Sequence, residues 1–231
     1  MKVKQLNGYS VLVILLVSLI AACAKNDPAP DTPVNVPMSV INASVRPNDV
    51  FNFYLKGTRQ TTTSVLNGAG TNFLQIPVGQ QILSIKGLFD NQNYNNADTL
   101  LTFPYNVAQL GSTERYLFFV GGPARSSAFM VRDTAVTDQA NALLKFVSVS
   151  AAVPAVTVYM NDTLRFTSKA FGSVNRYVKV GNGLKAIKIF VPGNTTPILT
   201  ANVRLNVDSV YTLYSYGGSG ANFRIGLLRG Q

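Results

Sequence analysis

Few residue types in this 231-residue chain are suited to acid–base or nucleophilic chemistry. The chain has no histidine, and Glu114 is its single glutamate among 10 acidic residues. Histidine is the commonest general base near neutral pH, the usual activator of a nucleophilic serine or cysteine, and a frequent zinc ligand. We therefore predict that the protein is not an enzyme and that it has no catalytic residues, no metal site and no cofactor.

The polar loop 90–98, which reads DNQNYNNAD, is open to two other interpretations. A calcium loop needs several oxygen ligands at short spacing, and a glycosidase needs two carboxylates across a cleft, which Asp90 and Asp98 would supply if they converged. The loop lacks the glycine and the glutamate of an EF-hand, and aspartate beside asparagine commonly serves turns. We expect an exposed loop, and a glycan-directed hydrolase is the less favoured alternative.

Cys23 is placed where a covalent lipid would be attached. It is the only cysteine of the chain, and it follows Ile20-Ala21-Ala22, which resembles the bacterial lipobox. Lys2 and Lys4 precede an apolar run over 11–22 that is too short to span a bilayer. We predict that residues 1–22 are a lipoprotein signal peptide and that Cys23 carries the lipid anchor. The alternative is an ordinary secretory signal that ends near a cysteine.

Residues 23–37 are rich in proline and are predicted to form an extended tether. The residue after the cysteine is Ala24, whereas aspartate at this position retains similar lipoproteins in the inner membrane. The sequence therefore predicts a protein held by its lipid at the outer membrane, facing the periplasm or the cell exterior.

The formal charge of +10 is unevenly distributed. Residues 141–231 contain 10 Lys and Arg against 2 Asp and Glu, a net charge of +8, while residues 38–140 contain 7 against 6, a net charge of +1. Such an excess fits a basic face for an anionic glycan or envelope polymer, but solvated strand faces and edges are the favoured interpretation because these residues are scattered through the domain. The predicted location and the absence of recognised motifs argue against nucleic acid.

The elements expected to position these residues are short β-strands. Phe51, Phe53 and Leu55 alternate with polar or smaller residues, and so do Val156, Val158 and Met160. Alternation with period two is typical of half-buried antiparallel strands, and Gly-, Asn- and Pro-rich turns separate the runs. About seven strands in roughly 100 residues favour a β-sandwich. Tyr211, Tyr214 and Tyr216 are predicted to form a tyrosine corner or cross-strand pairs.

The two halves of the chain share a sequence pattern, which indicates an internal duplication. Four matches occur in the same order: 42–57 with 148–162, 73–79 with 177–183, 100–102 with 198–200, and 116–122 with 212–218. We therefore predict two tandem domains, domain 1 over 38–140 and domain 2 over 141–231.

Three segments of the second half resemble DUF4397, a family of domains of unknown function. They are 147–162 (VSVSAAVPAVTVYMND), 171–183 (FGSVNRYVKVGNG) and 196–200 (TPILT). Two aspartates common in that family are replaced by Ala152 and Thr157. The resemblance implies tandem immunoglobulin-like or prealbumin-like antiparallel β-sandwich domains on an extracytoplasmic, anchored protein. It implies no activity.

These observations favour a non-enzymatic cell-envelope lipoprotein that serves as a binding or structural module. A carbohydrate-binding surface lipoprotein is the alternative, and the expected partners are the membrane, an anionic or neutral glycan, or another envelope protein. If a binding face exists, we predict that it lies on domain 2 and combines Tyr177, Lys179, Lys188 and Phe190. Alternation places these four residues opposite the inward Val178, Val180, Ile187 and Ile189.

Overall fold

The computed structural model describes residues 34–88, 99–122, 127–134, 136–153, 155–167 and 170–230. The predicted signal peptide, Cys23, most of the tether and the loop 90–98 lie outside the described residues. Within the described part, no helix has the length and apolar character needed to cross a membrane.

The described residues form an all-β fold, as predicted. The first half contains β1 (Asn35–Asn42), β2 (Val50–Leu55), β3 (Thr58–Arg59), β4 (Leu74–Pro77), β5 (Gly79–Leu88), β6 (Thr99–Val107), β7 (Glu114–Val120) and β8 (Ala128–Thr134). The second half contains β9 (Ala142–Ser148), β10 (Thr157–Met160), β11 (Thr163–Thr167), β12 (Val178–Val180), β13 (Gly183–Phe190), β14 (Leu199–Leu205), β15 (Ser209–Gly217), the short 3-10 helix η2 (Gly220–Asn222) and β16 (Phe223–Gly230).

The folded part starts earlier than the predicted boundary at residue 38. Strand β1 begins at Asn35, and Val36, which the sequence assigned to the tether, pairs with Ile76 of β4. Val36 is buried in the first core, so the last residues of the predicted tether belong to the sheet.

The strand order of the first half is repeated in the second half. The first half has an inner sheet, β4-β1-β7-β8, and an outer sheet, β3-β2-β5-β6; the second half has an inner sheet, β12-β9-β15-β16, and an outer sheet, β11-β10-β13-β14. Each strand of the first half thus corresponds to the strand eight places later. The named strands pair antiparallel except for β1 with β7 and β9 with β15, which are parallel. Parallel neighbours need a long connection, and five intervening strands provide it in each half.

Each half has its own apolar core between its two sheets. The first core contains Phe51, Phe53 and Leu55, and the second contains Val158, Ile187 and Ile189, as alternation predicted. The predicted fold of β-sandwich domains is therefore confirmed for the described residues.

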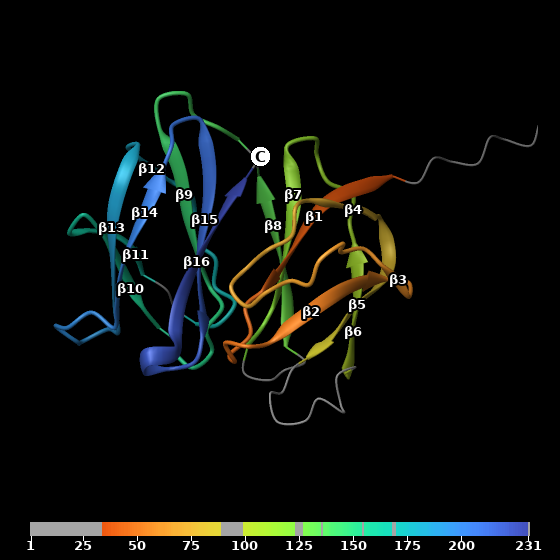
Figure 1. Ribbon diagram of the computed structural model, residues 1–231. Coiled ribbons are helices and arrows are strands. Elements are labelled where there is room, and N and C mark those ends of the chain that lie inside the picture. Colours follow the sequence, from red (N-terminus) through yellow and green to blue (C-terminus); the bar gives the residue numbers. More distant parts are fainter. Residues whose placement is uncertain are drawn as a thin grey trace, which may run out of the picture. The chain divides into compact units, whose positions relative to one another are not determined.

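A third apolar cluster joins the two inner sheets. It contains Leu117, Phe119 and Val131 from the first half and Val147 and Tyr214 from the second. The four sheets consequently stack in layers, with the two inner sheets facing each other between the two outer sheets (Figure 1). Both faces of each inner sheet carry buried side chains.

One sequence match between the halves is displaced by one residue. The match of 116–122 with 212–218 pairs Tyr116 with Thr212. In the structure Tyr116 pairs with Met38 of β1 and lies in the first core. Its counterpart in the second half is Tyr211, which pairs with Leu144 of β9 and lies in the second core. A slip of one residue moves side chains to the other face of a strand, so the displaced match would exchange core and interface positions.

The three late tyrosines have separate roles. The hydroxyl of Tyr211 accepts a hydrogen bond from the backbone N–H of Asn206 at 3.1 Å, the upstream contact expected of a tyrosine corner. Tyr214 and Tyr216 instead pack together in the third cluster, with ring centroids 5.8 Å apart.

Candidate binding surface

The structure does not bring the four predicted site residues together. Lys179 lies on β12, at the edge of the second inner sheet, and Tyr177 directly precedes that strand. Lys188 and Phe190 lie on β13 of the second outer sheet. The predicted single face is therefore corrected, because β12 and β13 are consecutive in sequence but belong to opposite layers of the sandwich.

Tyr177 is part of the contact between the two halves. Its hydroxyl donates a hydrogen bond to Oδ1 of Asp133 at 2.5 Å, and the ammonium of Lys145 lies 5.1 Å from the centre of its ring. Burial raises the pKa of the Tyr177 phenol, and the nearby Asp133 carboxylate raises it further. The phenol therefore remains a protonated donor, and the half-buried side chain is already engaged with Asp133 of the first half.

Asp133 is the centre of a buried ion cluster, which we define as Arg115, Asp133, Lys145 and Tyr177. Nε of Arg115 lies 2.8 Å from Oδ2 of Asp133, and Nζ of Lys145 lies 2.5 Å from Oδ1. The Asp133 side chain is 0% exposed. Arg115 and Asp133 come from the first half and Lys145 and Tyr177 from the second, so the cluster fixes how the inner sheets meet.

The balance of burial and charge keeps Asp133 ionised. Burial by itself would raise the pKa of the carboxyl, but the charge of Lys145 and the hydrogen bonds from Lys145 and Tyr177 outweigh it and lower the pKa overall. Burial lowers the pKa of Lys145, and the adjacent Asp133 carboxylate opposes that effect. The carboxylate is thus necessary for keeping two cations in this layer.

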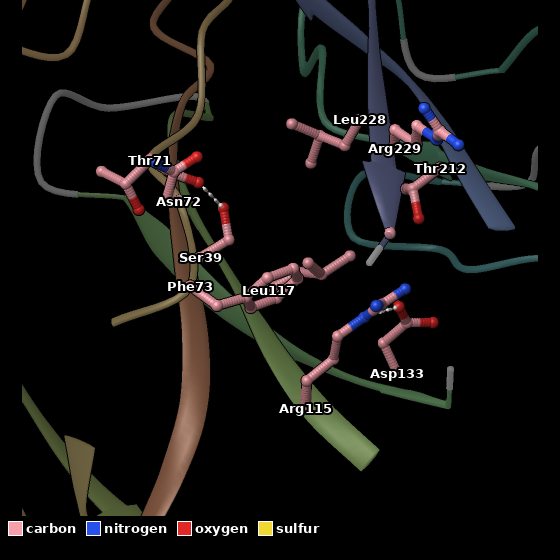
Figure 2. A pocket seen from close by; sticks show the side chains of 11 residues that line it. Ser39, Thr71, Asn72, Phe73, Arg115, Leu117, Asp133, Thr212, Leu228 and Arg229 are labelled. Atoms are coloured by element: carbon pink, nitrogen blue, oxygen red, sulfur yellow. Dashed lines mark hydrogen bonds and ion pairs between the residues drawn. The ribbon is translucent and has the colours of Figure 1, made fainter. Parts of the chain in front are cut away.

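A cavity of about 50 Å³ lies beside the buried ion cluster. Figure 2 shows Arg115 and Asp133 on one side and Thr212, Leu228 and Arg229 on the other. A volume of this size holds a few water molecules, whereas ligand pockets usually start at about 300 Å³. We therefore regard this cavity as part of the contact between the halves.

Lys179 is exposed and forms an ion pair that the sequence did not indicate. Its Nζ lies 2.8 Å from Oδ2 of Asp138, in the connection between β8 and β9. The hydrogen bond from Lys179 is the largest of several contributions that lower the pKa of Asp138 to about 2. An ion pair of this kind on the surface contributes little to folding stability.

Lys188 and Phe190 contribute to a groove on the outer face of the second outer sheet. We call it the aromatic groove and define it by Thr157, Tyr159, Asp162, Lys188, Phe190 and Asn194. Its volume is about 320 Å³, and Val191, Pro192 and Gly193 complete its lining. The face around it is open to solvent, since Leu164 and Leu184 are 50% and 59% exposed. The aromatic groove is therefore accessible to a ligand.

Strand pairing places the side chains of the aromatic groove. Tyr159 lies opposite Lys188, and Thr157 lies opposite Phe190, so the two rings are diagonal neighbours on one face. Their centroids are 5.3 Å apart at an interplanar angle of 77°, an edge-to-face arrangement. Nζ of Lys188 donates to Oδ1 of Asp162 at 2.6 Å.

Two tight turns form the rim of the aromatic groove. Asn161 and Asp162 both have positive φ (48° and 61°) in the two-residue loop between β10 and β11, as a type I′ hairpin requires. Oδ1 of Asn161 accepts from the N–H of Ala186 at 2.9 Å, which ties this loop to β13. At the other rim the N–H of Asn194 donates to the carbonyl of Val191 at 3.0 Å, with Pro192 and Gly193 (φ 88°) between them, a type II turn.

Among the described residues, the first half does not repeat the side-chain combination of the aromatic groove. Tyr54 occupies the position of Tyr159, but the residue opposite Tyr54 is Ser84, where the second half has Lys188. Likewise, the pair Asn52 and Lys86 in the first half takes the place of the pair Thr157 and Phe190 in the second half. The duplicated framework therefore carries this combination of rings and charges only in the second half of the described chain.

Sequence reasoning missed Tyr159, Asp162 and Asn194. Alternation with Val158 and Met160 placed Tyr159 on the outer face, but nothing in the sequence shows that β10 pairs with β13. Asp162 and Asn194 are residue types typical of turns, and both lie in turns; their second role depends on which strand lies beside each turn. Among the described residues, no group of three or more Asp, Glu, His or Cys could hold a metal ion.

The second half matches a known protein family. Residues 142–230 match the model of a domain of unknown function, DUF4397, so the predicted resemblance is confirmed for this part of the chain. No curated protein matches the chain in sequence.

Proposed function

We propose that this protein is a non-enzymatic cell-envelope lipoprotein and that its second half binds a ligand in the aromatic groove. The observation that carries the proposal is the position of the groove, where two rings and an ion pair meet on a sheet face open to solvent. Among the described residues, the inner sheets offer no comparable surface, because the faces that point away from their own cores pack against each other.

The chemistry of the aromatic groove supports a binding role. Asp162 is the single carboxylate that lines it, and glycosidases use two. Its other polar residues are Thr157, Tyr159, Lys188 and Asn194, and the chain contains no histidine to serve as a base. A purely structural role, in which the sandwiches space other parts of the envelope, is the alternative.

We expect Tyr159→Ala to weaken ligand binding by about tenfold or more, because aromatic side chains usually contribute most to a binding surface. The measurement is retention of the purified full chain on an array of glycans and envelope polymers, with Phe190→Ala as a second variant. Tyr54→Ala is the matched control, since it removes the equivalent tyrosine of the first half. If Tyr159→Ala and Tyr54→Ala bind as the unmodified chain does, the aromatic groove is not the binding site and the structural role is favoured.

The proposed anchor predicts that Cys23→Ser abolishes lipid attachment, since no second thiol is available. Cells labelled with radioactive palmitate should show a labelled band for the unmodified chain and none for the variant. The variant should also stay uncleaved or leave the membrane fraction. Labelling that persists in Cys23→Ser would contradict the anchor at this residue.

A further inference from the structure

We infer that the ligand of the aromatic groove is a neutral sugar unit of an oligosaccharide rather than an anionic polymer. This inference rests on the proposed function and specifies its ligand class. Net charge alone points the other way, because residues 141–231 carry 10 Lys and Arg against 2 Asp and Glu. The local arrangement of charges decides between the two.

One of those two acids lies in the aromatic groove. Asp162 pairs with Lys188 at 2.6 Å, so the charges that line the groove sum to zero. An anionic ligand would have to displace Asp162 from the ammonium and would then lie beside an unpaired carboxylate. The negative charges of the ligand and of the Asp162 carboxylate would repel each other, which disfavours an anion at this position.

The same ion pair suits a neutral diol. The side chains of Lys188 and Asp162 are 39% and 77% exposed, so both can be reached from solvent. A sugar hydroxyl can donate to the carboxylate of Asp162 while its neighbour accepts from the ammonium of Lys188. Hydrogen bonds to charged groups are stronger than those between neutral groups. Thr157 and the amide of Asn194 add neutral partners elsewhere in the lining of the groove.

The two rings provide the apolar part of such a site. Tyr159 and Phe190 pack edge to face, which leaves ring surface available for the C–H groups of a pyranose. The groove volume of about 320 Å³ lies at the small end of ligand pockets, which range from about 300 to 1,000 Å³. That volume suits one or two sugar units and is small for a larger ligand.

The test is isothermal titration of the full chain in detergent with neutral tetrasaccharides of glucose, mannose, galactose and xylose, and with tetragalacturonate as the anionic probe of equal length. We expect at least one neutral probe to bind, with an affinity that does not change between low and high salt. Tyr159→Ala and Asp162→Asn should each weaken that binding by about tenfold or more.

Asp162→Asn keeps the fold, because asparagine is well tolerated at positive φ, and Tyr54→Ala is again the control. The inference is overturned if tetragalacturonate binds more tightly than every neutral probe and Asp162→Asn strengthens it; the proposed function then stands with an anionic ligand. It is also overturned if no tetrasaccharide binds. In that case the proposed function is judged separately, by whether Tyr159→Ala removes binding of an envelope polymer on the array.

Discussion

Asp133→Asn is expected to lower the free energy of unfolding by about 3 to 5 kcal/mol, the usual cost of removing one partner from a buried ion pair. Asparagine has nearly the same shape as aspartate, so the effect would come from charge. Without the carboxylate, Arg115 and Lys145 remain buried in the contact between the inner sheets, with side chains only 5% and 3% exposed. Urea unfolding followed by tyrosine fluorescence measures the change, since the chain has 10 tyrosines and no tryptophan.

Glu114→Gln is the matched control for this variant. Glu114 also pairs with an arginine, Arg132, at 2.5 Å, but that arginine side chain is 60% exposed. Exposed pairs contribute about 0 to 1 kcal/mol, so this control should change stability little. A loss below about 1 kcal/mol for Asp133→Asn as well would show that the cluster is not fixing the two halves together.

The pH dependence of Asp133 has a defined sign. Its folded pKa is lowered from an unfolded value of about 3.9, so its contribution to stability is complete above that value and is lost as the pH falls through the folded pKa. The stability difference between the unmodified chain and Asp133→Asn should therefore shrink below about pH 4. A difference that stays constant down to pH 2 would contradict the lowered pKa.

Tyr214→Ala is expected to lower the free energy of unfolding by about 3 to 5 kcal/mol, as removal of a fully buried aromatic ring does. Tyr214 lies in the third cluster, where its ring packs on Phe119 of the first half with centroids 5.4 Å apart. Its hydroxyl donates to the carbonyl of Gly68 at 2.9 Å. The ring lies over Gly226, where a Cβ would come within 2.2 Å of the Tyr214 ring carbon Cζ.

Two further variants separate the contributions at this position. Tyr214→Phe keeps the ring and removes the hydrogen bond to Gly68, and we expect it to cost about 1 kcal/mol. Gly226→Ala should cost about 1 to 3 kcal/mol through crowding of the ring, whereas Gly181→Ala, which has its nearest neighbour at 3.6 Å, should be nearly neutral. If Tyr214→Ala lowers the free energy of unfolding no more than Tyr214→Phe does, the packing role of the ring is contradicted.

The sequence was sufficient to predict the inward faces of several strands. Phe51 and Phe53 in the first core, and Val158, Ile187 and Ile189 in the second, follow from strict alternation with period two. Alternation shows which side chains face the core of their own sandwich. It does not show what lies on the other face, and that explains the error at Tyr177.

Tyr177 does point away from its own core, as predicted, but the face that it occupies is covered by the first half. The sequence does contain an indication that these strands are covered on both faces. Residues 117–120 and 143–147 are nearly continuous apolar runs, which are typical of strands buried on both faces. Such runs do not identify the covering partner, so the contact between Asp133 and Lys145 could not be derived from them.

The measurement that tests the central claim most directly is an NMR titration of the isotope-labelled chain with the glycan or envelope polymer that it retains. We predict chemical-shift changes at Tyr159, Lys188 and Phe190 on the open outer sheet, and none at Tyr177, which is half-buried and hydrogen-bonded to Asp133 of the first half. Changes centred on Tyr177 and Lys179, with the outer sheet unaffected, would contradict the assignment of the binding surface.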